Sequence, residues 1–298
     1  MAGLPALPQA TVGVIGGSGL YHMEGLSDVR EVRIETPFGS PSDAITVGRL
    51  GDVSLAFLPR HGRGHRLSPT EVPARANIWA LKQLGAQWVI SVSAVGSLRE
   101  DYAPLHLVLP DQLYDRTKLR PGTFFEGGVV VHASFADPFC PHLSGILWEA
   151  MTGVRDVTCH RGGTYVCIEG PLFSTKAESH IYRQLGCDVI GMTALPEAKL
   201  AREAELCYAT IACVTDYDVW RESTETVTVE MVVANLHKNV ANAQHIIRDV
   251  AGRLPADRSA SPCGCSSALA HAIITDPAAI PASARERYAL LLEKYLPE

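Results

Sequence analysis

The sequence predicts an α/β protein in which a central, largely parallel β-sheet is flanked by helices. Short runs rich in β-branched residues alternate with segments of helical periodicity along the whole chain. Apolar residues make up 47% of the 298 positions, which is enough for a sizeable core. We find no internal repeat and no low-complexity tract that would indicate another architecture.

The individual elements follow from these two periodicities. Strands are expected at Thr11–Ile15, Ile45–Val47, Val53–Leu58, Trp88–Val92, Leu107–Leu109, Thr164–Ile168, Val189–Met192 and Ile211–Thr215. Helices are expected at Asn77–Leu84, Lys176–Leu185, Pro196–Glu205 and Val229–Val250, with Gly252 as the stop of the last one. Residues 255–262 have the composition of a linker, so we expect a main domain over residues 1–254 and a C-terminal tail over residues 255–298, helical over Ser283–Tyr295.

Composition narrows the classes of partner and the compartment. The net charge is −6 and the pI is about 6.0, so we expect no basic surface for duplex nucleic acid or an anionic membrane. The N-terminus lacks the basic start of a signal peptide, and no apolar run reaches the length of a membrane span. We therefore expect a cytoplasmic protein. The eight cysteines are too few for a disulfide scaffold, and most are expected to be buried thiols.

Two segments rich in glycine or hydroxyl groups follow predicted strands. The turn Gly16–Gly19 can close its backbone N–H groups and the Ser18 hydroxyl around a phosphate oxygen. It matches neither a dinucleotide fingerprint nor a Walker loop, and by itself a plain turn is the simpler interpretation. Ser91–Ser97 is expected to be a strand that runs into a turn of small residues, where anion binding and tight packing are equally good explanations.

A basic cluster ends another strand. Arg60–His65 brings two arginines and two histidines into one short segment. The planar fork of an arginine matches two phosphate oxygens, and a histidine can add a donor beside it. No acidic residue lies nearby in the sequence, which weakens the alternative of a solvated basic turn. The cluster therefore indicates an anion site.

Two aspartates follow the apolar strand Ile211–Thr215. Residues two apart on an extended strand point the same way, so Asp216 and Asp218 are expected to face one pocket. Like charges raise one another's pKa, and a carboxyl with a raised pKa can share or deliver a proton near neutral pH. Metal binding is the competing interpretation, but no histidine or further acid lies at ligand spacing.

Further side chains follow two other predicted strands. Phe173 comes after the strand Thr164–Ile168, and Met192 and Thr193 end the strand near Val189. A phenylalanine or methionine at a strand end packs into a core more often than it lines a ligand pocket, so these residues alone do not indicate a site.

Taken together, these motifs resemble the methylthioadenosine phosphorylases of the trimeric nucleoside phosphorylase family. The resemblance spans roughly residues 12–254 and rests on GGSGLY, TPFGSPSD, RHGRGH, NIWALKQLGA, SAVGSLRE, DRT, IEGPLFSTKAES, GMTALPEAKLA and TDYDVW. It implies the single-domain nucleoside phosphorylase fold, with a central mixed, largely parallel sheet flanked by helices. It also implies a homotrimer, or a hexamer, with the active site at the subunit interface.

The resemblance assigns roles to individual residues. The positions that hold phosphate in the family are occupied by Ser18, Arg60, His61, Ser93, Ala94 and Thr193. Those that contact the nucleoside are Phe173 beside the base, Met192 at the ribose hydroxyls, Asp216 at purine N7 and Asp218 at the exocyclic N6. The pocket for the 5′-methylthio group is matched by Val229, Val232, Val233 and His132, the last supplied in the family by a neighbouring subunit.

The implied reaction is phosphorolysis of S-methyl-5′-thioadenosine to adenine and 5-methylthioribose 1-phosphate, a pentosyl transfer of purine and methionine salvage. Cleavage leaves positive charge on the sugar and negative charge on the purine, so phosphate and a proton donor at N7, Asp216, both lower the barrier. An ionised Asp218 accepts hydrogen bonds and favours a 6-amino group over a 6-oxo group. Phosphate is a co-substrate, and neither a cofactor nor a metal is expected.

Three alternatives stay open at this point. Methylthioinosine or broad-specificity purine nucleoside phosphorolysis is the nearest, and Asp218 argues against the first of these. A regulatory module could bind a nucleotide at the same loops without turnover. Hydrolysis, as in related nucleosidases, would leave Arg60 and His61 unexplained.

Two positions depart from the family pattern. Gly191 stands where an Asn commonly precedes the Met, so a polar contact behind the nucleoside is expected to be missing. Cys263-Gly264-Cys265 resembles the CxC motif near the C-terminus of some heat-stable archaeal members. A disulfide across one residue closes a strained ring, so two free thiols and a disulfide are both open possibilities.

Overall fold

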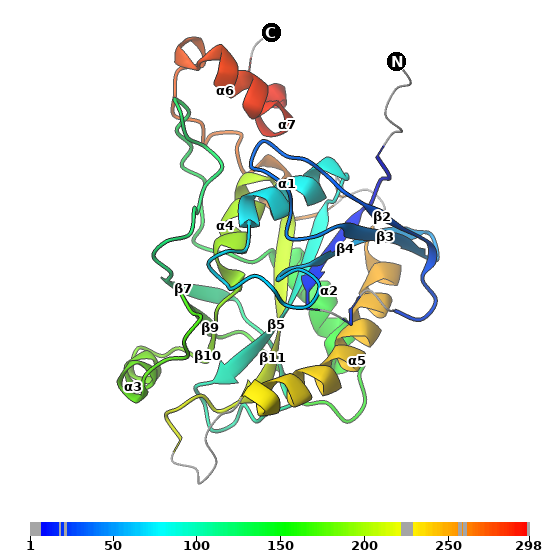
Figure 1. Ribbon diagram of the computed structural model, residues 1–298, viewed down its shortest axis with the longest axis vertical. Coiled ribbons are helices and arrows are strands. Elements are labelled where there is room, and N and C mark those ends of the chain that lie inside the picture. The colour runs from blue at the N-terminus through cyan, green and yellow to red at the C-terminus, as the bar shows by residue number, and fades with distance from the viewer. Residues whose placement is uncertain are drawn as a thin grey trace.

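The structure is a computed structural model that describes residues 7–17, 19, 20, 23–221, 229–255, 258 and 261–296, without the side chains of residues 229, 231, 232 and 236. One mixed sheet occupies its centre, and helices pack on it (Figure 1). Its strands are β1 (Val12–Gly16), β2 (Ser27–Val32), β3 (Ile45–Leu50), β4 (Val53–Pro59), β5 (Trp88–Ser97), β6 (Leu107–Leu109), β7 (Gln112–Arg116), β8 (Cys159–Arg161), β9 (Thr164–Ile168), β10 (Val189–Gly191) and β11 (Cys207–Asp216).

The sheet is largely parallel, as the sequence predicts. The strand order is β2-β3-β4-β1-β5-β10-β9-β7, and β11 pairs with β5 and β6 beside this path. β1 runs parallel to β4 and β5, and β5 runs parallel to β11, whereas β3 pairs in antiparallel fashion with both β2 and β4. Every residue of β1 and β11 is buried, because both faces of a central parallel strand are covered.

Helices cover both faces of the sheet. They are α1 (Ala74–Gln83), α2 (Pro141–Thr152), α3 (Lys176–Gln184), α4 (Ala194–Glu203), α5 (Val229–Arg253), α6 (Ala282–Arg287) and α7 (Ala289–Leu292). Along β1, Ile15 joins the apolar cluster under α1 and α4, whereas Val12 and Val14 join the cluster under α2 and α5. No helix within the described ranges combines the length and the apolar character needed to cross a membrane.

Several sequence predictions are wrong in detail. β5 continues through Ser97, so the expected turn of small residues after Val92 is strand instead, held between β11 and β10. α5 runs to Arg253, and Gly252 lies inside the helix. The expected tail helix is broken into α6 and α7. The sequence gives no clear signal for β2, which is almost wholly exposed, or for α2, whose N-cap is the thiol of Cys140.

The C-terminal segment packs on the main body. Leu269, Tyr288 and Leu292 are fully buried or nearly so, and they join the same apolar cluster as α1 and α4. The hydroxyl of Tyr288 accepts from the backbone N–H of Glu126 and donates to its carbonyl, both at 3.1 Å. This packing gives the C-terminal segment a fixed place on the fold. The proposed division of the chain at residue 254 stays a prediction.

Candidate active site

The predicted site residues gather where parallel strands end. β4, β1, β5 and β11 lie side by side and run the same way, so their carboxyl ends meet at one edge of the sheet. Ligand sites of open α/β sheets form at such an edge. Arg60 follows β4 directly, and its backbone N–H donates to the carbonyl of Gly16 at the end of β1 at 2.9 Å. Two of the segments expected to bind phosphate are thereby joined.

Arg60 is buried in an ion pair. Its Nε lies 2.5 Å from Oε1 of Glu197 on α4, and only 3% of the arginine surface is exposed. Other N–H groups donate to the Val92 carbonyl at 3.0 Å and to the Ser91 hydroxyl at 2.7 Å. The sequence suggested that the basic cluster has no acidic partner. This is wrong for Arg60, because Glu197 lies 137 positions away in the chain but contacts Arg60 in the fold. Nη1 makes one bond among the described residues, which leaves its second N–H for a ligand.

His61 is a neutral ring in this site. Its Nδ1 lies 2.9 Å from the carbonyl of Leu67, and since a carbonyl only accepts, Nδ1 carries the proton. Burial first, and then the charge of Arg60, lower the pKa of His61 to about 4. Nε2 of the neutral ring is therefore an acceptor, and the expectation that His61 donates beside Arg60 is wrong for the unliganded chain.

Two buried hydroxyls near Arg60 have no hydrogen-bond partner among the described residues. Ser93 on β5 is 5% exposed, and among the described residues neither its Oγ nor the Oγ1 of Thr193 makes a hydrogen bond. A buried polar group left unpaired costs about 1–3 kcal/mol, so such groups persist where a ligand pairs with them. Arg60, Met192 and Thr193 also line one narrow cavity. Ala94 follows Ser93 on the same strand and is half-buried.

Tyr165 occupies the space beside Gly191. A Cβ at Gly191 would lie 2.0 Å from the phenol oxygen of Tyr165, so a larger residue cannot stand there without moving the ring. The same oxygen lies 3.5 Å from the backbone N of Thr193. Tyr165, a residue that sequence reasoning did not identify, thus places a phenol hydroxyl beside Gly191.

Arg120 fixes the chain around Met192. It is 4% exposed, lies 3.2 Å from a carboxylate oxygen of Glu169, and donates to the carbonyls of Met192, Leu195 and Glu169. It also lines the cavity that Arg60 and Thr193 share. Sequence reasoning missed Arg120, because its acceptors are mostly backbone carbonyls from distant segments and leave no motif.

Asp216 is a buried carboxyl at the last residue of β11. Its Oδ2 accepts from the Thr215 hydroxyl at 2.7 Å, and its Oδ1 accepts from the backbone N–H of Asp218 at 2.8 Å. Burial is the largest effect on its pKa, which is raised despite these two hydrogen bonds; the nearby charge of Asp218 adds to the rise. A Cβ at Gly96 would lie 3.0 Å from Oδ1, so the glycine makes room for the carboxylate.

Asp218 faces the same region for a different reason than predicted. It does not continue the strand: its φ is 51°, in the left-handed region, and it sits in the turn that follows β11. Both of its carboxylate oxygens accept from the hydroxyl of Ser174, at 3.0 and 2.9 Å. The turn and Ser174, rather than strand alternation, orient this carboxylate.

Three other predicted residues are exposed in this single chain. Phe173 is 50% exposed on the loop before α3, Val233 is 42% exposed on α5, and His132 is exposed on a segment whose backbone pairs with Ala272. The start of α5 is nevertheless held at the site, since Asn235 donates to the Thr215 carbonyl at 2.8 Å. Ser18 and the side chains of Val229 and Val232 lie outside the described residues.

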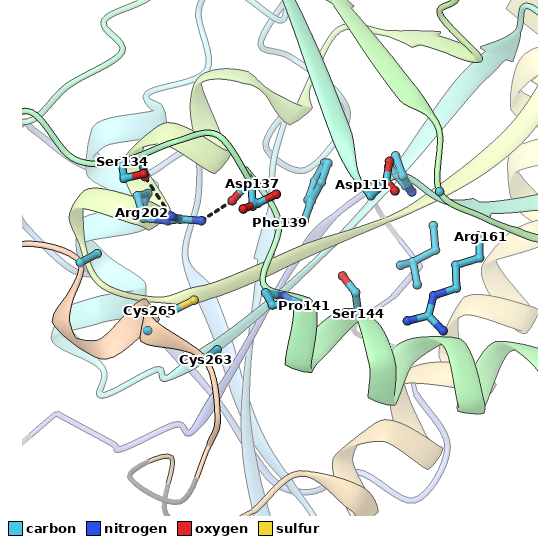
Figure 2. A pocket seen from close by; sticks show the side chains of 15 residues that line it. Asp111, Ser134, Asp137, Phe139, Pro141, Ser144, Arg161, Arg202, Cys263 and Cys265 are labelled. Atoms are coloured by element: carbon cyan, nitrogen blue, oxygen red, sulfur yellow. Dashed lines mark hydrogen bonds between the residues drawn. The ribbon is translucent and has the colours of Figure 1, made fainter.

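A larger pocket lies elsewhere. It has a volume of about 630 Å³, and Asp111, Arg161, Arg202, Cys263 and Cys265 are among the residues that line it (Figure 2). None of the predicted phosphate or nucleoside residues is in its lining. The volume of a pocket is therefore a poor guide to the reactive groups in this chain.

The family model and the curated relatives that match this chain all describe phosphorylases. Residues 11–251 match the family model described as "Phosphorylase superfamily". The chain is 56% identical over 291 residues to S-methyl-5′-thioadenosine phosphorylase of Gloeobacter violaceus, covering 97% of each chain. It is 58% identical over 287 residues to the protein of the same name from Chloroflexus aurantiacus, covering 96% of this chain and 98% of the relative.

Solved structures agree with this result. The crystal structure of a methylthioadenosine phosphorylase from an antarctic soil metagenomic library is 51% identical, with a TM-score of 0.90 over 95% of this chain and 99% of that one. Methylthioadenosine phosphorylase from Schistosoma mansoni, in complex with adenine, is 35% identical, with a TM-score of 0.78 over 95% and 98%. The mixed, mostly parallel sheet flanked by helices is the fold of these neighbours, so the predicted fold class is confirmed.

The buried carboxyl of Asp216 predicts a pH-dependent stability. Because its folded pKa is raised, Asp216 favours folding below the unfolded pKa, and this contribution is lost as the pH rises through the folded pKa. Asp216→Asn should therefore raise the free energy of unfolding at about pH 7, and the gain should vanish toward about pH 4. Urea unfolding across this range measures it, with the exposed Asp52→Asn as a control. A gain independent of pH would contradict the prediction.

Proposed function

The chain belongs to the phosphorylase superfamily, and we propose that it catalyses the phosphorolysis of S-methyl-5′-thioadenosine to adenine and 5-methylthioribose 1-phosphate. The two relatives of that name described above match nearly the whole chain at more than half identity. Within the site, one observation carries the proposal. The hydroxyls of Ser93 and Thr193, which have no hydrogen-bond partner among the described residues, lie at the edge of the sheet where Arg60 follows β4 and Asp216 ends β11.

The proposed phosphate site combines four donors. The free N–H of Arg60, the hydroxyls of Ser93 and Thr193 and the backbone N–H of Ala94 surround one anion, and Ser18 closes it from the turn after β1. Hydrogen bonds to a charged group are each worth about 1.5–3 kcal/mol, so this set binds phosphate tightly. The acceptor Nε2 of His61 suits a protonated phosphate oxygen, and it becomes a donor if phosphate raises the pKa of the ring.

The reaction follows from charge placement. A phosphate oxygen forms a bond to C1′ as the bond from C1′ to N9 breaks, and the electron pair of the broken bond passes to the purine. Asp216 is the proposed proton donor at N7, since its raised pKa keeps a proton available at higher pH than an exposed aspartate does. Met192 is proposed to meet the ribose hydroxyls through its backbone, and Arg120 positions that backbone.

We infer that the complete site requires a second subunit. Phe173, Val233 and His132 are exposed in one chain, whereas the proposed base and methylthio pockets need walls. A homotrimer, or a hexamer of two trimers, in which a neighbour contributes His132 explains both facts. We also propose that the enzyme works in the cytoplasm and uses no cofactor besides the co-substrate phosphate.

The oligomer is tested in solution. Sedimentation velocity of the purified chain should give a trimer or a hexamer, and His132→Ala should raise the KM for methylthioadenosine by about tenfold without dissociating the assembly. The same substitution should leave the KM for phosphate unchanged, because the phosphate residues come from one chain. A fully active monomer would overturn the assignment of His132.

The phosphate site is tested at its unpaired hydroxyls. Ser93→Ala and Thr193→Val should each raise the KM for phosphate by about 10–100-fold, since each loses a hydrogen bond to a charged ligand. Stability should change little, because the phenol of Tyr165 lies close to both hydroxyls but neither makes a hydrogen bond to a described residue. Ser179→Ala is the matched control: its hydroxyl is also buried and without a described partner, but it lies on α3. An unchanged KM for Ser93→Ala and Thr193→Val would remove both residues from the site.

The base is tested with paired substrates. With phosphate, the wild type should release adenine from methylthioadenosine faster than hypoxanthine from methylthioinosine. Asp218→Asn should shift this preference by about 10–100-fold toward the 6-oxopurine, because an amide can donate to its oxygen. Ser174→Ala, which keeps the carboxylate but loosens it, should weaken both activities without reversing the preference.

The same assay separates the alternatives. Release of base without phosphate would mean hydrolysis, and binding without release would mean a regulatory module. A wild type that prefers methylthioinosine would show that Asp218 has been misinterpreted.

A further inference from the structure

Four cysteines from three parts of the chain converge on one point. Cys140 caps the start of α2, Cys207 begins β11, and Cys263 and Cys265 flank Gly264 in the C-terminal segment. Their sulfur atoms all lie within 4.8 Å of one another, and the Sγ atoms of Cys207 and Cys263 are 3.4 Å apart. All four are free thiols, and three of them are buried.

This spacing suits a tetrahedral metal ion. Zinc–thiolate bonds are about 2.3 Å long, which places the sulfurs of a tetrahedral site about 3.8 Å apart. The observed separations bracket that value. A disulfide needs two sulfurs about 2.05 Å apart, but all four cysteines are free thiols here, and a four-coordinate ion explains why four of them meet at one point. Four thiolates without hard oxygen ligands select a soft or borderline cation such as Zn²⁺.

The surroundings suit negative charge on the sulfurs. The backbone N–H of Leu143 donates to the Sγ of Cys140 at 3.4 Å, and the Oγ of Ser261 lies 3.1 Å from the Sγ of Cys263. Arg258 places its Nη1 4.0 Å from the Sγ of Cys207. Four thiolates around a divalent ion carry a net charge of −2, and such N–H groups and cations orient and stabilise them.

A metal ion can reach the cluster through the pocket of about 630 Å³, because Cys263, Cys265 and Arg202 are part of its lining (Figure 2). Arg202 itself is tied to the carbonyls of Ser134 and Asp137, at 2.9 and 2.5 Å.

We propose that Cys140, Cys207, Cys263 and Cys265 bind one Zn²⁺ in a closed, structural four-thiolate site. The remaining thiols lose their protons to solvent as the ion binds, and no oxidant is needed. The site ties the C-terminal segment to α2 and β11, on the face of the sheet opposite the cluster that buries Tyr288. It replaces the sequence expectation that the protein has no metal.

The experiment uses tag-free full-length protein expressed with added zinc and purified without chelator. Elemental analysis should find about one zinc per chain. Replacing zinc with Co²⁺ under reducing, anaerobic conditions should give the thiolate charge-transfer and visible bands of a tetrahedral four-sulfur site. Cys263→Ser and Cys265→Ser should each lower the zinc content about tenfold or more, while Cys159→Ser, outside the cluster, should keep it.

Two results would overturn the proposal, and neither depends on whether the variants fold. The first is wild-type protein that holds no zinc and takes up none after anaerobic reduction. The second is a mass for the unreduced, denatured protein that shows the cluster cysteines paired in disulfides in metal-free material. With zinc bound, a strong chelator should lower the melting temperature of the wild type and leave Cys265→Ser unchanged.

Discussion

The buried ion pair between Arg60 and Glu197 joins the parts of the molecule that form the site. Glu197 also accepts from the hydroxyl of Tyr208 on β11 at 3.1 Å, and Arg60 reaches β5 through Ser91 and the Val92 carbonyl. One guanidinium and one carboxylate thus connect β4, β5, β11 and α4. Removing one partner of a buried ion pair lowers the free energy of unfolding by about 3–5 kcal/mol, because the other charge is left buried without compensation. Arg60 therefore supports the fold as well as the proposed anion site.

That double role separates Arg60 from the two hydroxyls beside it. Ser93 and Thr193 make no hydrogen bond among the described residues, so their burial is not explained by a contribution to the fold. Asp218 lies at φ 51° in the left-handed region, which aspartate adopts more readily than most residues. Among the groups proposed to touch substrate, local stability therefore explains Arg60 but not Ser93 or Thr193.

The C-terminal segment is bound to the body by polar as well as apolar contacts. Glu205, 2% exposed, accepts from the Tyr295 hydroxyl at 2.5 Å and from the backbone N–H of Leu269 at 3.1 Å. Tyr288 adds apolar contact on the same side, and the cysteine cluster meets the segment at its start. A segment of few and short helices is thereby held in a single place on the fold.

The sequence by itself determined the alternation of strands and helices, the parallel core and the family, because apolar runs and motifs are local properties of the chain. It also indicated the glycine, basic and acidic segments of the candidate site. Only the tertiary structure paired Arg60 with Glu197, set Tyr165 against Gly191, and showed that a turn with Ser174 orients Asp218. It alone brought together cysteines as distant as Cys140 and Cys265. Such partners are chosen by the packing of segments far apart in the chain, and no local pattern of residues records that packing.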